Sequence, residues 1–343
     1  MRRKKHYNKH SITFELCDKA NGFFNTYTNN VTQKAFRGNY KKFITFCREK
    51  FDCKTEDDCK KHIQDYADYL TDKGCTASTV HTYISPCCLY LGVDMKTIEK
   101  PLRKASEFTR GRYCEARSTR KNAMISNPKY KRTVEFQKRV GIRRTELANL
   151  CGDDLVRDES GYLCVRVKRG KGGKMQLQRI LPGYEKLVEK YFKGKNADDR
   201  IFSEHELNND VPYHYLRAKQ AQRAYAYYAD LLSGPGGEEM RELLINEMRM
   251  RFEATCGDKL THTPRKNRTD SKETEPTGKK RNKKKFNEQE ARGTYTLRGD
   301  NRKFALEHGL PVSYDKTCLL AVSMFHLSHY RNNVTVVDYL LVL

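Results

Sequence analysis

Five side chains of types that could act together on a phosphodiester are spread over the second two thirds of the chain. They are Arg143, Lys171, Arg298, His329 and Tyr339. A guanidinium group can hold two non-bridging oxygens of a phosphate and offset the charge that builds up on it. A lysine can protonate a leaving alkoxide, and a tyrosine can form a covalent intermediate. This set needs no divalent metal, and the sequence has no carboxylate cluster to hold one, so we expect neither metal nor cofactor.

Some of these residues have neighbours that compete for the same roles. Tyr330 is a rival nucleophile, but it directly follows His329 and should point elsewhere. His326 lies in the apolar stretch "MFHL", so we expect it on the buried face of a helix. Arg144 adjoins Arg143, and Lys174 follows Lys171 in the same glycine-rich segment. Arg302 and Lys303 are more typical of surface charges.

The elements that must position these residues fall into two groups, and the first third of the chain is helical in pattern. Residues 32–51 carry aromatic side chains at helical spacing. Residues 55–74 open with Thr55 and close on Gly74, which are favourable helix-capping residues. Residues 76–92 are a third helix, which Pro86 should kink or split. We therefore predict a small helical bundle.

The pattern of the second group, after the first third of the chain, predicts a mostly helical unit with a small sheet. A helix should end near "GIRRTELANL", and residues 161–182 alternate around a glycine-rich turn, which predicts two strands of a hairpin. Residues 184–192, 212–232 and 238–254 have helical patterns. Residues 258–292 have little apolar content and predict a mobile basic insertion. The fold class is thus mainly α with a small antiparallel β-sheet.

The basic stretch 100–123 is typical of a linker, so we place the domain boundary near Glu115. The first domain would then span residues 1–115, with a basic segment at 1–10. The second would span residues 116–343.

The net charge of +24, from 67 Lys+Arg against 43 Asp+Glu, predicts a polyanionic partner, with nucleic acid the usual one. The 12 cysteines include no C-x-x-C pair, and the spacing of Cys53 and Cys59 does not match a zinc site. We find no signal peptide and no apolar run long enough to span a membrane. We therefore expect a cytoplasmic protein with buried, inert thiols.

In order and local context, the candidate residues resemble those of the tyrosine recombinases, or phage-type integrases. That family pattern has Arg in G-x-R-x-x-E-L, Lys in a β-hairpin, H-x-x-R, and L-G-H followed by Tyr. Here "GIRRTEL" holds Arg143, "RGKGGK" holds Lys171, "YTLR" holds Arg298, and "LSHYRNNVTVVDY" holds His329 and Tyr339.

The sequence departs from that family pattern in three ways. Tyr295 stands where H-x-x-R has its histidine. It would either donate a hydrogen bond to the phosphate or only pack. Ser328 replaces the glycine before His329. Many members also carry a further helix after the nucleophile, for which the sequence shown leaves no room.

The resemblance implies a helical core-binding domain and a catalytic domain of the DNA breaking-rejoining fold. It implies a site-specific recombinase that integrates or excises a mobile element through a 3′-phosphotyrosyl link at Tyr339. Arg143 and Arg298 would hold the phosphate, Lys171 would protonate the leaving 5′ oxygen, and His329 would hydrogen-bond the phosphate. Neither metal nor ATP would be required.

The implied partner is double-stranded DNA carrying specific sites, bound by a homotetramer, with room for an accessory directionality factor. The protein would be associated with the nucleoid. Two alternatives stay open: a DNA-binding protein of the same fold with impaired catalysis, and a type IB topoisomerase-like enzyme that relaxes supercoils.

Overall fold

The computed structural model describes residues 11–27, 30–102, 115–170, 175–208, 210–257 and 286–343. The chain divides into two compact units, Met1–Ala105 and Ser106–Leu343. In the described ranges, no helix is both long enough and apolar enough to cross a membrane.

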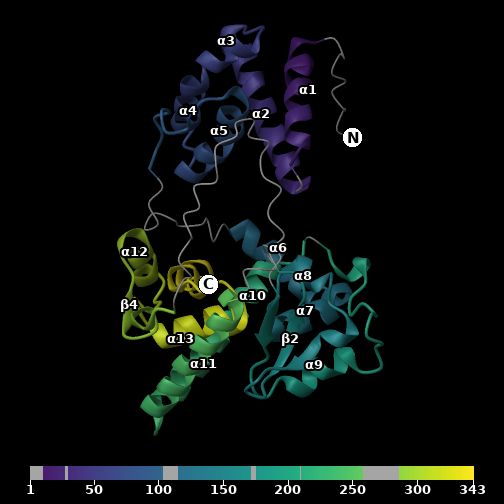
Figure 1. Ribbon diagram of the computed structural model, residues 1–343, viewed down its shortest axis with the longest axis vertical. Coiled ribbons are helices and arrows are strands. Elements are labelled where there is room, and N and C mark those ends of the chain that lie inside the picture. Colours follow the sequence, from purple (N-terminus) through teal and green to yellow (C-terminus); the bar gives the residue numbers. More distant parts are fainter. Residues whose placement is uncertain (1–10, 28–29, 103–114, 171–174, 209, 258–285) are drawn as a thin grey trace. The chain divides into compact units, whose positions relative to one another are not determined.

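The first unit is a helical bundle (Figure 1). It contains α1 (Ile12–Asn25), α2 (Asn30–Phe51), α3 (Glu56–Lys61), α4 (Ile63–Asp72) and α5 (Ala77–Leu91). The Thr55 side chain accepts from the backbone N–H of Asp58, and Asp58 caps Thr55 in return, so the start of α3 is fixed locally. Helix α5 runs through Pro86 without being split. Interlocking aromatic rings fill the core, among them Phe24, Tyr40 and Phe43.

The second unit begins with α6 (Glu115–Ser126), α7 (Lys131–Val140) and α8 (Arg144–Leu147). A three-stranded antiparallel sheet follows, formed by β1 (Leu155–Arg157), β2 (Leu163–Val167) and β3 (Gln176–Arg179) in that order. The predicted hairpin is β2–β3, which pairs Cys164 with Arg179 and Val167 with Gln176. The sheet packs against α7 and α9 (Glu185–Phe192) in one apolar core.

Two long helices, α10 (Tyr213–Ser233) and α11 (Gly237–Gly257), lie beside the C-terminal part of the unit. A second antiparallel pair joins β4 (Thr294–Thr296) to β5 (Ser313–Asp315), with α12 (Gly299–Glu307) between them. Then α13 (Lys316–Ala321) continues into the π-helical turn η7 (Val322–Leu327). The chain closes with α14 (Asn332–Thr335) and the π-helical turn η8 (Val336–Leu340).

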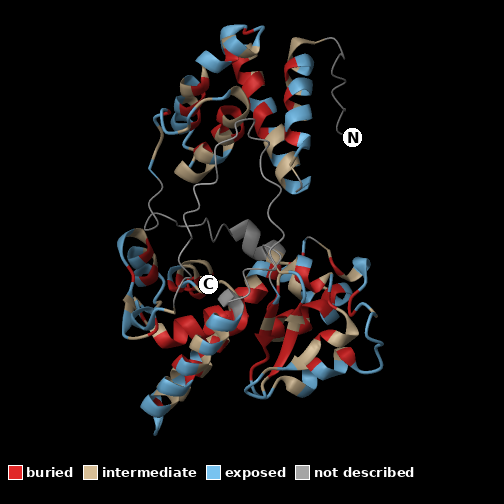
Figure 2. Cartoon of the chain, viewed as in Figure 1, coloured by how far each residue is buried: buried red, intermediate tan, exposed pale blue. Residues whose placement is uncertain are grey.

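Buried residues line α10, α13 and η7 where they meet (Figure 2). The predicted fold class, mainly α with a small antiparallel sheet, is confirmed. Residues 258–285 of the predicted insertion lie outside the described residues. Within residues 286–292, Phe286 meets the ring of Phe252 and Ala291 is fully buried, while residues 287–290 are exposed.

Candidate functional site

The segment that carries Arg143 is fixed at a glycine turn between α7 and α8. Gly141 ends α7 at φ +67°, and a Cβ there would lie 3.1 Å from Cβ of Gln220 on α10. Both the left-handed backbone and the close approach require glycine. The sheet supports the same turn, because the Gln178 amide donates to the carbonyl of Val140 at 2.5 Å.

Arg143 is held by Glu146, one turn further along. The Arg143 backbone N–H donates to Oε2 of Glu146 at 2.8 Å, and its guanidinium donates to Oε1 at 2.5 Å. Glu146 is 4% exposed, whereas the Arg143 side chain is 26% exposed. The carboxylate therefore fixes the arginine from the buried side. Among the described residues no further hydrogen-bond partner of this guanidinium is recorded, so its outer N–H groups are suited to binding an anion.

Arg217, on α10, is buried, with an exposure of 2%. Its guanidinium donates to the carbonyl of Gly141 at 2.6 Å and to the carbonyl of Leu327 at 2.7 Å. Its Cζ lies 5.8 Å from the ring centroid of Tyr339. Burial lowers the pKa of this guanidinium, and the cation Arg143 lowers it further. Two buried or half-buried cations with one carboxylate between them favour an added anion.

His329 stands on a strained backbone just after η7. Its neighbours Ser328 and Tyr330 have φ of +54° and +53°. Its Nδ1 lies 3.1 Å from Oγ of Ser323, and that oxygen also accepts the backbone N–H of Arg331 at 2.8 Å. Its Nε2 is buried and has no hydrogen-bond partner among the described residues. Such an orphaned ring nitrogen is suited to a ligand or a reacting group.

The pKa of His329 is lowered to about 3 by burial, and Arg217, Arg331 and Arg143 add to the effect. The imidazole is therefore neutral near pH 7. A neutral ring has one nitrogen that donates and one that accepts.

Tyr339 lies in η8 and is 7% exposed. Its ring stacks on His329 with centroids 5.7 Å apart and on His214 with centroids 5.2 Å apart. The Gln222 amide on α10 donates to the carbonyls of Tyr339 at 3.3 Å, Leu340 at 3.2 Å and Val342 at 2.5 Å. The segment around the tyrosine is thus attached to α10, with Leu341 fully buried. We call Arg143, His214, Arg217, His329 and Tyr339 the tyrosine cluster.

Two residues expected at the site, Tyr295 and Arg298, lie outside this cluster. Tyr295 is half-buried in β4, and burial raises its pKa. Arg298 is exposed at the N-terminus of α12. Within the described residues, the structure records no contact from either side chain to Tyr339, His329 or Arg143. The β4–β5 pair packs through Leu297 and Tyr314 against Val336, Leu340 and Leu341, which flank Tyr339 in the chain.

The sequence reading missed His214 and Arg217, although a signal was present. "HYLR" at 214–217 has the H-x-x-R spacing and, unlike "YTLR" at 295–298, it has the histidine. Both side chains project from the first turns of α10. Lys171 lies in the connection between β2 and β3, outside the described residues.

The competing residues have structural contacts of their own. His326 is fully buried between Gln220 and Tyr228, 3.2 Å and 3.1 Å from its ring nitrogens, as its apolar context predicts. Tyr330 packs edge-on against Phe252 at 5.8 Å. Arg144 donates twice to the carbonyl of Leu207.

Neither a protein-family model nor a curated protein matches this chain. Among solved structures, the chain is similar to the crystal structure of XerA recombinase. Identity is 16%, the match covers 65% of this chain and 86% of that chain, and the TM-score is 0.22. XerA recombinase is thus a distant structural neighbour, and the functional argument rests on the tyrosine cluster itself.

Proposed function

We propose that this protein is a site-specific DNA recombinase that cuts and rejoins strands through a covalent link to Tyr339. The observation that carries the proposal is the tyrosine cluster. The tyrosine is stacked on two histidines and has Arg217 over its ring, and Arg143 is close enough to act electrostatically on both Arg217 and His329. A nucleophile and its candidate phosphate-binding groups therefore lie together.

In this mechanism, the Tyr339 hydroxyl gives up its proton to His329, to a phosphate oxygen or to water as its oxygen attacks the phosphorus, and the bond from phosphorus to the 5′ oxygen breaks. The 3′ end stays on the tyrosine as a phosphodiester, so the bond energy is kept for the return step. Lys171 protonates the departing 5′ oxygen. The 5′-hydroxyl of a partner strand then attacks the phosphotyrosyl link and frees Tyr339. We propose that four protomers on double-stranded DNA carry out the paired exchanges that integrate or excise a mobile element.

The phosphate-binding arginines in this proposal are Arg143 and Arg217. Arg217 replaces Arg298 in this role because it contacts Tyr339 and the segments that precede Arg143 and His329. His329 is neutral, so its unpartnered Nε2 can exchange a hydrogen bond with the phosphate or with the tyrosine hydroxyl. His214 stacks on the tyrosine ring and takes the histidine position of the H-x-x-R pattern.

The test is to trap the covalent intermediate on DNA nicked next to the cleavage point, so that the released fragment is lost. The wild type should form an adduct that survives denaturation, and Tyr339→Phe should form none while binding DNA as before. The trapped DNA, once sequenced, also identifies the site.

An adduct that persists in Tyr339→Phe would move the nucleophile to another residue such as Tyr330. Binding without any adduct in the wild type would favour a DNA-binding protein of the same fold. Relaxation of plasmids that lack the trapped site would favour the topoisomerase-like alternative.

A further inference from the structure

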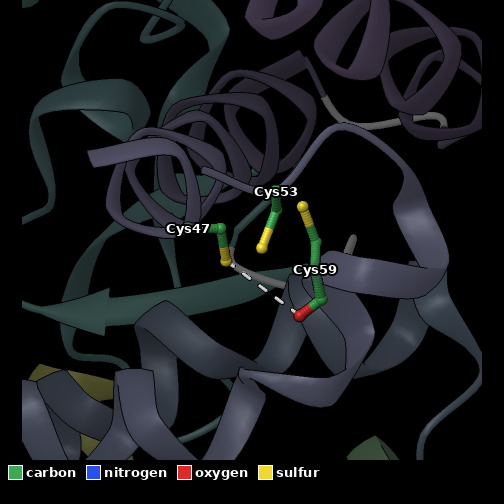
Figure 3. A group of neighbouring side chains, drawn as sticks. All are labelled: Cys47, Cys53 and Cys59. Carbon is green, nitrogen blue, oxygen red and sulfur yellow. Dashed lines mark hydrogen bonds between the residues drawn. The ribbon is translucent and has the colours of Figure 1, made fainter. Parts of the chain in front are cut away.

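Three cysteine thiols lie together in the first unit, at positions well before the tyrosine cluster in the sequence. They belong to Cys47, Cys53 and Cys59, and their Sγ atoms all lie within 4.8 Å of one another (Figure 3). All three residues are buried, with exposures of 0%, 4% and 0% respectively. All three are free thiols. Five residues separate each cysteine from the next, and this spacing matches no familiar zinc motif. The cluster therefore becomes visible in the structure and not in the sequence.

The chain reversal that brings Cys53 to the other two is held in place. Asp52 adopts φ +50°, which is unfavourable for a side chain other than glycine. The Arg48 guanidinium donates to Oδ1 of Asp52 and to the carbonyl of Cys53, both at 2.9 Å. The backbone N–H of Cys53 donates back to the carbonyl of Cys47 at 3.4 Å. A packing residue alone does not require this strained turn.

The three sulfurs come from different elements: Cys47 from α2, Cys53 from the turn after it, and Cys59 from α3. Figure 3 shows the side chain of Cys53 between those of its two partners. Zinc binds thiolate at about 2.3 Å, which places the sulfurs of a tetrahedral site about 3.8 Å apart. The observed separations of up to 4.8 Å are about 1 Å longer, so metal binding requires the three side chains to draw together by that amount.

A bound cation would offset the repulsion among three thiolates, and Arg48 already places one positive charge at the turn that carries Cys53.

We propose that Cys47, Cys53 and Cys59 form a thiolate site for one soft d10 metal ion, Zn²⁺ or Cu⁺. Both ions bind thiolate sulfur strongly. On binding, three S–H bonds are replaced by three metal–sulfur bonds, and three protons are released to solvent. The ion would tie the end of α2 to α3 and would stabilise the bundle.

The experiment uses the full chain, reduced with a phosphine and freed of metal, and titrated separately with Zn²⁺, Cu⁺ and Cd²⁺. Cd²⁺ is the optical probe because its bonds to sulfur absorb in the near ultraviolet. We expect one ion per chain, a sulfur-to-cadmium absorption band, and a raised Tm in the presence of metal. Competition between Zn²⁺ and Cu⁺, followed by elemental analysis, identifies the preferred ion.

The matched pair of variants is Cys53→Ser and Cys88→Ser. Cys88 is 3% exposed in the same core but is not one of the three clustered thiols. Cys53→Ser should weaken metal binding by more than about 100-fold, because changes outside the ligand set alone cost about 10–100-fold. Cys88→Ser should bind as the wild type does. Circular dichroism of both metal-free variants shows whether each is folded.

Two results would overturn the proposal. One is the absence of a sulfur-to-cadmium band in folded, fully reduced wild type. The other is equal metal affinity in folded Cys53→Ser and Cys88→Ser, which would return the three thiols to a packing role.

Discussion

At the scale of single residues, the structure brings Arg217, and not the predicted Arg298, to Tyr339. The Arg217 guanidinium donates to the carbonyls of Gly141 and Leu327, whereas Arg298 is exposed at the N-terminus of α12. Arg217→Lys keeps the positive charge but loses the two-pronged guanidinium. We expect it to slow cleavage of nicked DNA by about 100–1,000-fold, as for loss of one group that stabilises the transition state.

Arg298→Lys is the matched control and should cleave within a few-fold of the wild type. Both variants should bind DNA, and their unfolding midpoints show whether the buried Arg217 position still folds. If Arg298→Lys severely slowed cleavage while Arg217→Lys cleaved normally, the phosphate-binding role would return to Arg298.

The buried histidine makes a pH prediction of its own. The pKa of His329 is lowered to about 3 in the folded chain, mainly by burial, from an ordinary value of 6.5. Below pH 6.5 the unfolded chain takes up a proton that the folded chain does not, so stability falls as pH falls toward 3. The slope from this residue approaches about 1.4 kcal/mol per pH unit.

Urea unfolding at pH 7, 6 and 5 measures that slope. His329→Gln should flatten it, and His205→Gln, at an exposed position, should leave it unchanged. Equal slopes in the wild type and His329→Gln would contradict the burial argument. His326 has the same lowered pKa of about 3 and should retain its own share of the slope in both variants.

At the scale of elements, the turn between η7 and α14 carries backbone strain. Ser328 has φ +54°, and its Oγ is buried with no hydrogen-bond partner among the residues that the structure describes. Both features are unfavourable for serine. Ser328→Gly should therefore raise the free energy of unfolding by about 1 kcal/mol, after the entropy cost of glycine in the unfolded chain.

Ser328→Ala separates the two causes, because it removes the hydroxyl but keeps a Cβ at positive φ. In a denaturant titration, its free energy of unfolding should rise by only part of the increase expected for Ser328→Gly. A glycine variant no more stable than the alanine variant would assign the whole effect to the hydroxyl.

The elements show which parts of the molecule were readable from sequence. Helix periodicity and caps gave α2 and α5, because these signals are local. The short strands β4 and β5 were missed, since three residues are too few to show alternation. The link between Arg143 and Glu146 spans one helical turn, so its motif was visible.

Interactions between distant segments were not readable in the same way. Arg217 and Leu327 are 110 positions apart, and nothing in the chain marks them as partners. The three clustered cysteines likewise looked unrelated until the turn at Asp52 brought them together. In both cases, tertiary packing decides which of several similar residues meet.

At the scale of the whole molecule, the excess of positive charge makes a prediction that does not depend on the site. Six of the seven residues in 279–285 are Lys or Arg. Replacing this stretch by Ser and Gly of the same length should weaken DNA binding equally for specific and unrelated sequences. It should also reduce the slope of log K against log salt by up to about 5, because each phosphate that a cation neutralises adds about 0.9 to that slope.

The control replaces residues 270–276, which have the same length and a net negative charge, and should leave the slope as in the wild type or slightly steeper. Cleavage of DNA already bound at saturating protein should be unchanged in both variants, because neither change replaces a residue of the tyrosine cluster. An unchanged salt slope in the 279–285 replacement would mean that the charge responsible for DNA affinity lies elsewhere in the chain. Such a result would direct the search to the lysines and arginines of the first unit.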